Sequence, residues 1–369
     1  MKYIKVSIFF VSLLICQWSF AKIIMPPYLQ AVTTNSIIVM VETDSKSQVT
    51  INYGVGKALN LVSIETISIA KITRLKKGYI HKVKLSGLKS NTKYNYQAHH
   101  EGKSSKSYTF WTGIDDDTEF SFAWMADCRT NIDIHNKIAS RIKEANPRFS
   151  VYGGDLCFRR NYKSWKNEFF TEKEQELISV VPFFNTVGNH EGWNKRTKAF
   201  TKAPQSSSGK EDYYSFDYGN VHFLVLNTQK KCSKGSKQYN FAEKDLKISN
   251  SKWKIVIFHK PAYVYSSRMG NENMKIMSKE IFTKTGVNLV FNGDSHFYQH
   301  NIVDGLNHLV IGSAGAPLYS PGTSENTIKS EREYNYGIIN VKKENLNVTV
   351  FNEKGKILEE IIIKNNNSN

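Results

Sequence analysis

No stretch after residue 21 is long and apolar enough to cross a membrane. The one long apolar run, Val6 to Cys16, is itself well short of the roughly 20 residues that a spanning helix needs. Lys2 and Lys5 precede this run, and Ser19-Phe20-Ala21 then offers small residues at the two positions that a signal peptidase reads. Residues 1–21 are therefore interpreted as a secretory signal peptide. The mature chain is expected in the periplasm or outside the cell, with no integral membrane segment.

Cysteine is scarce, with four residues in a chain of 369. A lipoprotein anchored through Cys16 is disfavoured, because bulky Ile15 stands where such sites carry a small residue. The mature chain keeps Cys128, Cys157 and Cys232. An oxidising compartment permits one disulfide among three cysteines and leaves one thiol over.

The chain also lacks any nucleic-acid-binding motif and any block of like charge. Its 50 Lys and Arg against 33 Asp and Glu give a net charge of +17, which falls to about +15 when Lys2 and Lys5 are removed with residues 1–21. Such an excess raises the local concentration of anionic partners without identifying them. The lysines are scattered, so a solvated surface is the default interpretation and no specific nucleic-acid binding is expected. The positive charge alone does not predict a phosphate-bearing substrate, because such a substrate also requires a defined binding site.

The first part of the mature chain, residues 26–113, shows no helical periodicity. Short β-rich runs alternate there with turn signals, at the spacing of a small antiparallel sandwich. The expected strands are Ser36–Glu42, Gln48–Tyr53, His81–Leu85, Thr92–Gln97 and Lys106–Trp111. We expect residues 22–115 to form an all-β domain that ends in a polar linker, Gly113–Thr118.

From residue 119 the pattern changes to strand, loop, helix, which predicts an α/β domain over residues 116–364. Helices are expected at Asn131–Glu144, Lys163–Val180 and Asn273–Lys284, and short strands after Tyr334 close a sheet. Residues 365–369 are expected to be a disordered tail. Six apolar strands each run into a polar residue: Phe120–Ala126 into Asp127, Phe149–Tyr152 into Asp155, Val181–Val187 into Asn189, Phe223–Leu226 into Asn227, Ile255–Phe258 into His259 and Val287–Phe291 into Asp294.

Ligands of open α/β sheets bind outside the carboxyl ends of the strands, where this sequence places its Asp, Asn and His residues. A single aspartate after a strand is often a helix cap, and a single histidine is more often a hydrogen-bonded core residue than a metal ligand. Five such segments in order are hard to explain without a metal site. They are Ala126-Asp-Cys-Arg129, Gly153-Gly-Asp-Leu-Cys-Phe158, Gly188-Asn-His-Glu191, Val256-Ile-Phe-His259 and Gly293-Asp-Ser-His296.

With these segments the sequence resembles the calcineurin-like metallophosphoesterase superfamily, and within it the purple acid phosphatases and their bacterial relatives. Further matches are Pro26–Gln30, Asn220–Leu226, Gly312–Tyr319, and Leu85–Tyr96, which is similar to part of a fibronectin type III module. The resemblance implies an all-β sandwich followed by an α/β catalytic domain that is a four-layer α/β/β/α sandwich. It also implies a metal-dependent phosphatase.

The resemblance implies two divalent cations roughly 4 Å apart, which bind the phosphate and activate a water. Carried over by motif, the first site would use Asp127, Asp155 and His296, and the second would use Asp155, Asn189, His259 and Asp294. His190 stands at the position that faces the substrate, where an imidazole could hold the phosphate or protonate the leaving alcohol. Arg129 and His300 are the other expected substrate contacts.

Three departures from the family pattern change the expected chemistry. Phe158 stands where purple enzymes have tyrosine, so no ferric-tyrosinate colour is expected. Arg129 stands where other members place a histidine ligand, which weakens the first site and suits a phosphate oxygen. Asp294 replaces a histidine, which favours Mn, Mg or Ca over Zn or Fe, or marks a decayed site.

Cys128 and Cys157 lie within two residues of Asp127 and Asp155. A disulfide that braces the site, a pair of buried inert thiols, and Cys157 as a ligand are all compatible with this spacing.

The leading hypothesis is hydrolysis of phosphate monoesters without a covalent intermediate on the enzyme, because no loop with a Ser or Cys nucleophile is present. The same site acting on phosphodiesters or nucleotides is the second hypothesis. A non-catalytic secreted binding protein with a degenerate metal site is the third.

Overall fold

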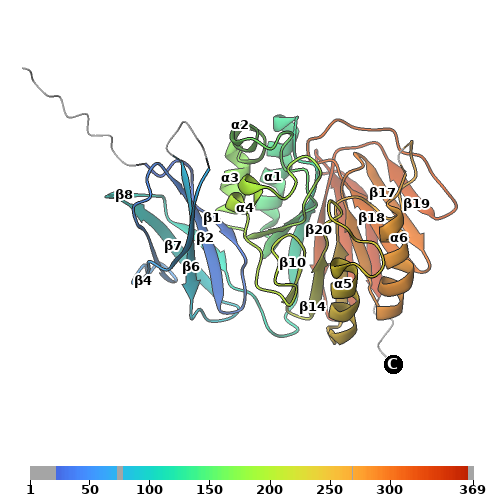
Figure 1. Cartoon of the computed structure of the whole chain (residues 1–369), viewed down its shortest axis with the longest axis horizontal. Helices are drawn as coiled ribbons and strands as arrows, with labels where there is room; N and C mark the ends of the chain where they lie inside the picture. Colours follow the sequence, from blue (N-terminus) through green and yellow to red (C-terminus); the bar gives the residue numbers. More distant parts are fainter. Residues whose placement is uncertain (1–21, 73–77, 268, 365–369) are drawn as a thin grey trace, which may run out of the picture.

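The computed structural model describes residues 22–72, 78–267 and 269–364. The predicted signal peptide and the predicted tail both lie outside these residues. A β-sandwich occupies one end of the long axis, and α6 (Glu272–Met277) with its neighbouring strands occupies the other (Figure 1). The fold is a β-sandwich followed by an α/β part, as predicted. No helix of the described residues is both long and apolar enough to cross a membrane.

Three parallel strands stand at the centre of a large sheet. β10 pairs with β11 and β11 with β12, all in parallel, while β20 continues the sheet antiparallel to β10. The strands after residue 334 thus close this sheet, as predicted. Within the described residues its order is β22 (Ile357–Lys364), β21 (Asn345–Asn352), β20 (Asn335–Val341), β10 (Phe120–Met125), β11 (Phe149–Tyr152), β12 (Phe183–Asn185), β1 (Tyr28–Gln30), β2 (Ser36–Thr43), β6 (Tyr79–Ser86) and β5 (Thr66–Lys71).

The sandwich is continuous with this large sheet. β1 pairs in parallel with β12 through Gln30 and Phe183, so one sandwich sheet extends the sheet of the α/β part. The other sandwich sheet contains β4 (Leu61–Ser63), β3 (Val49–Val55), β7 (Lys93–His100) and β8 (Lys103–Ser104), with β9 (Tyr108–Trp111) paired to β7.

The segment predicted as a polar linker is packed at its start. The Gly113 N–H donates to the Thr33 carbonyl at 2.9 Å, and the Gly219 N–H donates to the Ile114 carbonyl at 3.0 Å. Ile114 is 2% exposed. Gly113–Thr118 contains no helix or strand and joins β9 to β10, and it departs from the predicted polar linker only at its start, where Ile114 is buried while Asp115–Asp117 are exposed.

The second sheet also has parallel strands at its centre. β14, β15 and β16 pair in parallel, so their carboxyl ends meet at one edge, as do those of β10 to β12. Within the described residues the order is β13 (Tyr214–Tyr218), β14 (Val221–Val225), β15 (Trp253–Ile257), β16 (Leu289–Asn292), β18 (Leu306–Ile311), β17 (Tyr298–Val303) and β19 (Thr327–Glu331).

Alternate side chains of β10 fill two different cores. Phe122 and Trp124 lie between the two sheets, where the Trp124 ring stacks on Phe291 at 4.9 Å. Ala123 and Met125 face the opposite way, in the cluster that contains Ile138 of α1. A strand covered on both faces is apolar at nearly every position, and the half-buried Ser121 is the one exception in β10. The layers are helix, sheet, sheet, helix, because α5 (Lys237–Ile248) and α6 cover the second sheet in the same manner.

Helix α1 (Ile132–Ala145) confirms the first predicted helix, and the Asn131 side chain caps it by accepting the Ile134 N–H. The predicted helix at 163–180 is broken. It consists of α2 (Tyr162–Ser164), a π-helical turn (Trp165–Phe169) and α3 (Glu172–Ile178). The break falls where Thr171 accepts the Glu174 N–H and starts α3 as a new helix. A hydroxyl that serves as a helix cap competes with helix continuation.

The third predicted helix is also irregular. α6 runs into a π-helical turn (Ser278–Phe282) and a 3-10 turn (Thr283–Thr285), and it ends at Gly286, whose φ of 71° suits glycine. The short α4 (Lys195–Phe200) follows the loop of the third motif.

His222 on β14 ties the edge of the second sheet to α5. Its Nδ1 lies 2.7 Å from Asp217, and its Nε2 lies 2.8 Å from Asp245. Burial alone would lower the pKa of His222, but these two carboxylates outweigh it and raise the pKa to about 9. The protonated ring stabilises the fold, so its contribution is complete below the unfolded pKa of about 6.5 and is lost as the pH rises through about 9.

His222→Gln should therefore lower the free energy of unfolding by up to about 3 kcal/mol at pH 6. The loss should shrink towards zero at pH 10, and urea unfolding at both pH values measures it. An equal loss at the two pH values would contradict the proposed charge on His222. The exposed pair Lys247 and Glu243 offers a control, because Lys247→Gln should change stability little at either pH.

Candidate metal centre

Loops at the carboxyl ends of the parallel strands bring together the predicted ligands. Asp127 follows β10, Asp155 follows β11, and His259 follows β15 of the other sheet. One ligand atom from each of these three residues lies within 4.8 Å of the other two, and all three side chains are buried. Two buried carboxylates this close favour a cation between them.

Three aspartates of the site have left-handed backbones. The φ angles are 57° at Asp127, 55° at Asp155 and 63° at Asp294. This conformation is uncommon outside glycine and clusters at functional sites, where the surrounding fold imposes it. Each of these residues turns the chain sharply just after a strand, which aims its carboxylate across the end of the sheet.

Neighbouring glycines allow this close approach. A Cβ on Gly188 would lie 2.1 Å from the Asp155 nitrogen and 2.2 Å from its Oδ1. A Cβ on Gly293 would lie 2.6 Å from Asp127 Oδ2. Any larger residue in place of the glycine of Gly-Asn-His-Glu or of Gly-Asp-Ser-His would therefore clash with a ligand aspartate.

His259 provides a test of whether a cation fits. Its Nδ1 lies 2.7 Å from the Gly153 carbonyl, which can only accept, so Nδ1 carries the hydrogen. Its Nε2 faces oxygens: Asn189 Oδ1 at 3.2 Å, Asp155 Oδ1 at 3.3 Å and Asp294 Oδ1 at 3.5 Å. In a neutral ring this nitrogen is an acceptor that faces acceptors. Either a proton on Nε2 or a cation among these four atoms removes the conflict, and a donor set of three oxygens and one nitrogen fits a cation.

The same environment shifts the histidine's proton affinity. Burial lowers the pKa of His259, but Asp155, Asp127 and Asp294 outweigh it and raise the pKa to about 9. The ring thus experiences an excess of negative charge, which a bound cation would neutralise.

The Asp127 side of the site has a different set of contacts. His296 Nδ1 lies 2.7 Å from the Pro317 carbonyl, and His296 Nε2 lies 3.4 Å from Asp127 Oδ1. Arg129, which is 6% exposed, reaches into the same space. Its Nη2 lies 3.3 Å from His296 Nε2, and its Nε lies 3.5 Å from Asp155 Oδ2.

His190 is the accessible histidine at the edge of the cluster, with its side chain 23% exposed. Its backbone N–H donates to Asp155 Oδ1 at 2.9 Å. Its Nδ1 donates to the Phe158 carbonyl at 2.8 Å, which leaves Nε2, 3.7 Å from Asp155 Oδ2, as the nitrogen that faces the site. The Phe158 ring packs on the imidazole at 5.0 Å and is 45% exposed.

His300 is not brought to the cluster by these contacts. It lies on β17, is 3% exposed, and uses Nδ1 on Glu359 at 3.0 Å and Nε2 on Asn307 at 3.1 Å. The predicted substrate contact by His300 therefore has no support in the geometry. The residue is four positions after His296, but the intervening strand turns it towards β18 and β22.

Glu191 is a member of the site to which the sequence analysis gave no role. It is fully buried, and its Oε1 accepts the Gly188 N–H at 2.7 Å and the Asp155 N–H at 3.1 Å. Burial and the charge of Asp155 raise the pKa of Glu191 to about 7. This carboxyl group joins two ligand loops. The sequence feature that could have identified Glu191 is its position as the fourth residue of Gly-Asn-His-Glu, directly after His190.

Glu191→Ala should lower the free energy of unfolding by about 2 kcal/mol, because it leaves two buried N–H groups without an acceptor. Metal affinity should fall about 10- to 100-fold, the usual effect of losing a residue that orients ligands. Glu191→Gln keeps an acceptor and should lose much less of both. Urea unfolding and calorimetric Mn²⁺ titration measure the two effects, with exposed Glu243→Ala as the control. Equal losses for the Ala and Gln variants would exclude this positioning role.

Cys128, Cys157 and Cys232 are free buried thiols, with no disulfide among the described residues. Cys157 donates to the Arg159 carbonyl at 3.3 Å, and burial raises the pKa of its thiol. A protonated buried thiol is inert, so of the three interpretations left by the sequence the structure agrees with inert thiols.

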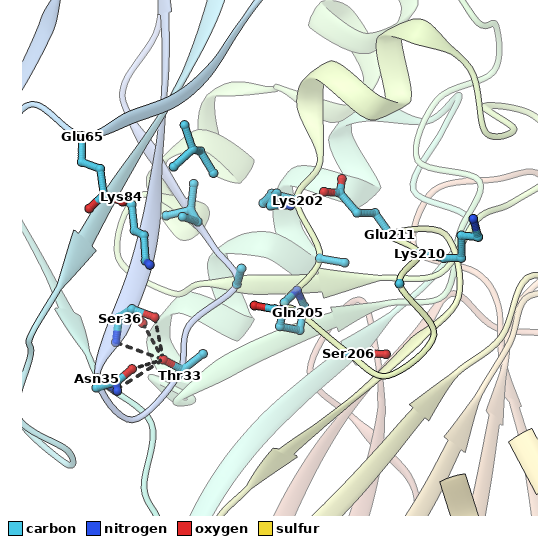
Figure 2. A pocket seen from close by; sticks show the side chains of 16 residues that line it. Thr33, Asn35, Ser36, Glu65, Lys84, Lys202, Gln205, Ser206, Lys210 and Glu211 are labelled. Atoms are coloured by element: carbon cyan, nitrogen blue, oxygen red, sulfur yellow. Dashed lines mark hydrogen bonds and ion pairs between the residues drawn. The ribbon is translucent and has the colours of Figure 1, made fainter. Parts of the chain in front are cut away.

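A hollow of about 640 Å³ lies elsewhere, between β2, β6 and the loop around Lys202 (Figure 2). Lys84, Lys202 and Lys210 line it together with Glu65 and Glu211. Lys202 pairs with Glu211, so the positive charge is partly neutralised. None of its 16 lining residues is a predicted ligand.

Comparison with known families finds two matches. The Calcineurin-like phosphoesterase family matches residues 120–298, and the Purple acid Phosphatase, N-terminal domain family matches residues 27–112. Both matches agree with the resemblance that the motifs indicated.

Plant purple acid phosphatases are among the similar proteins. A purple acid phosphatase of Glycine max is 30% identical over 66% of this chain and 59% of its own length. A "probable inactive purple acid phosphatase 9" of Arabidopsis thaliana is 28% identical over 46% of this chain and 34% of its own length. The chain thus spans about three fifths or less of these two relatives.

A solved structure is similar in fold. The purple acid phosphatase from yellow lupin (Lupinus luteus) seeds superposes with a TM-score of 0.78 at 19% identity, over 92% of this chain and 74% of that one.

Proposed function

Because the chain belongs to the calcineurin-like phosphoesterases, with a purple acid phosphatase N-terminal domain before the catalytic part, we propose that it is an exported, metal-dependent phosphomonoesterase. The observation that carries the proposal is the set of oxygens around His259 Nε2, at 3.2 to 3.5 Å. Four side chains from both sheets converge there on a point that suits a cation.

Asp155, Asn189, His259 and Asp294 would hold the cation. Three oxygen donors against one nitrogen, with two negative charges, favour Mn²⁺, Mg²⁺ or Ca²⁺ over Zn²⁺ or iron. When bound, the cation supplies Lewis acidity towards the phosphate and an activated water. The family resemblance implies a second cation on Asp127, Asp155 and His296, on the side of the site where the Arg129 guanidinium lies.

His190 is proposed as the group that protonates the leaving alcohol. Its Nδ1 is held by the Phe158 carbonyl, so a proton gained or lost at the site resides on Nε2. Its exposure agrees with an approach from solvent, whereas Asp127, Asp155 and His259 are buried.

Arg129 is proposed to bind the phosphate. A guanidinium keeps its charge at any physiological pH and donates two parallel hydrogen bonds to neighbouring oxygens. Phe158 lies beside Arg129, with the Arg129 Cζ 5.6 Å from its ring centre.

A non-catalytic role is the second candidate. Two observations favour it: a guanidinium lies among the ligands, and one of the similar plant proteins is described as probably inactive. In that case the β-sandwich would bind a partner, and the metal site would not hydrolyse phosphate esters.

Export belongs to the same proposal and rests on the sequence of residues 1–21. Sequencing the amino terminus of protein recovered outside the cytoplasm tests it. A first residue at Lys22 is expected, and an intact Met1 on exported protein would contradict cleavage.

The substrate class is tested with metal-loaded protein, residues 22–369, on three substrates. We expect phosphate release from p-nitrophenyl phosphate well above that from bis(p-nitrophenyl) phosphate and a nucleoside diphosphate. Preference for the diester or the diphosphate would replace monoesterase activity by one of those activities. No turnover of any of the three, by folded and metal-loaded protein, would favour the binding role.

A further inference from the structure

We infer that the guanidinium of Arg129 takes the place of the first cation, so that each chain binds one divalent cation and not two. His259 and His296 are the two histidines among the proposed metal ligands, and their contacts differ. Both donate Nδ1–H to a backbone carbonyl at 2.7 Å, so in the neutral ring each presents Nε2 to the site as an acceptor.

The two Nε2 atoms differ in their surroundings. That of His259 faces three oxygens, a donor set that suits a cation. That of His296 faces one oxygen, Asp127 Oδ1 at 3.4 Å, and also a donor, because Arg129 Nη2 lies 3.3 Å away and can direct a hydrogen at its lone pair. The coordination that a metal would supply to His296 is thus supplied by an N–H group of this chain.

Arg129 also supplies the charge of the missing cation. Its Nε lies 3.5 Å from Oδ2 of Asp155, the residue that both predicted sites would share. The side chain is 6% exposed, so solvent screens it weakly. A divalent ion bound to Asp155 Oδ2 and His296 would stand in contact with a permanent positive charge and compete with it for both ligands.

A side chain that lies next to Arg129 is a second departure from the family pattern. Arg129 Cζ lies 5.6 Å from the centre of the Phe158 ring, at a distance typical of a cation–π contact. Phe158 stands where the purple enzymes have their tyrosine ligand. The two replacements therefore touch each other, and each removes a donor from the first site.

The inference relies on the proposed function only for the binding of a cation at His259. Its test counts ions and needs no turnover. Protein stripped by a chelator is dialysed against excess Mn²⁺ and then against metal-free buffer, and Mn²⁺ per chain is measured by elemental analysis. An EPR spectrum then distinguishes an isolated ion from a magnetically coupled pair.

We expect one Mn²⁺ per wild-type chain with an uncoupled spectrum, and two with a coupled spectrum in Arg129→Ala. Arg159→Ala is the matched control. Arg159 also lies over Phe158, at 5.8 Å, and its removal should leave the count at one. Two ions in the wild type, or one in a folded Arg129→Ala, would overturn the inference.

A second pair of variants decides the question if Arg129→Ala does not fold. His259→Ala should lose the single ion, whereas His296→Ala should keep it. Loss of the ion in folded His296→Ala would overturn the inference. One bound ion without turnover would refute the proposed activity and leave this inference standing, whereas no bound ion at all would refute both.

Discussion

Asp155→Asn is expected to remove turnover of phosphate esters, with a fall in kcat of at least about a hundredfold. Loss of a residue that merely supports a ligand costs about 10- to 100-fold, and Asp155 is itself a predicted ligand. Its Oδ1 lies 3.3 Å from His259 Nε2 and accepts the His190 N–H at 2.9 Å. Its Oδ2 faces Arg129 at 3.5 Å.

The asparagine keeps the shape of this side chain but removes its charge, and its amide group places hydrogens against donors. Rates at saturating Mn²⁺ and calorimetric Mn²⁺ binding measure the effect. Asp212→Asn is the matched control, since Asp212 is also buried and its Oδ2 accepts from Asn227 at 3.0 Å outside the cluster. Its turnover per folded molecule should be unchanged. Full activity in Asp155→Asn would mean that the chemistry occurs elsewhere.

Gly188→Ala should have the second largest effect. The added Cβ would lie 2.1 Å from the Asp155 nitrogen, a backbone atom that cannot rotate away. Either the Asn189 loop or the Asp155 loop must shift, which separates ligands that now converge. We expect a loss of about 3 kcal/mol in the free energy of unfolding, the upper range for overpacking, and loss of Mn²⁺ binding.

Gly337→Ala on β20 is its control, because the nearest atom to an added Cβ there is Ile311 Cδ1, at 3.5 Å. That contact is ordinary, so the change should stay under about 1 kcal/mol. Urea unfolding and Mn²⁺ titration of both variants measure the difference. A folded Gly188→Ala that binds Mn²⁺ as well as Gly337→Ala does would show that the close approach of the two loops is unimportant.

The sequence could predict that four ligands lie close together, namely Asp127, Asp155, Asn189 and His259, because each stands just after a predicted strand. Each follows an apolar run, and parallel strands bring their carboxyl ends to one edge. The left-handed backbone of the aspartates could not be predicted in the same way. It results from the close packing of loops that are far apart in the sequence.

Side-chain direction was beyond sequence reasoning for the same reason. His300 follows His296 closely but points to Glu359, 59 residues further along the chain. Arg129 was identified as a departure, yet its contact with His296 depends on a loop 167 residues away. Glu191 belongs to a motif that the sequence analysis identified. Its hydrogen bond to the Asp155 N–H could not be predicted, because it depends on the contact between the Asn189 loop and the Asp155 loop.

The fold shows a similar division. Strand periodicity predicted both parts of the chain, because it is a local property. The pairing of Gln30 with Phe183 joins strands that are 153 residues apart, and nothing local marks it. The predicted helix at 163–180 is broken because the Thr171 side chain caps the start of α3. In the sequence alone, a threonine at this position is equally compatible with the surface of a continuous helix.

The central claim, a phosphoesterase that depends on a cation at His259, is tested most directly by removing and restoring the metal. Residues 22–369 are stripped with a chelator and assayed for phosphate release from p-nitrophenyl phosphate, before and after adding back Mn²⁺, Mg²⁺, Ca²⁺, Zn²⁺ or Fe²⁺ singly. We predict no release by the stripped protein and recovery with one of the oxygen-preferring ions, absent in His259→Ala. Release that survives chelation, or recovery that His259→Ala shares, would contradict the claim.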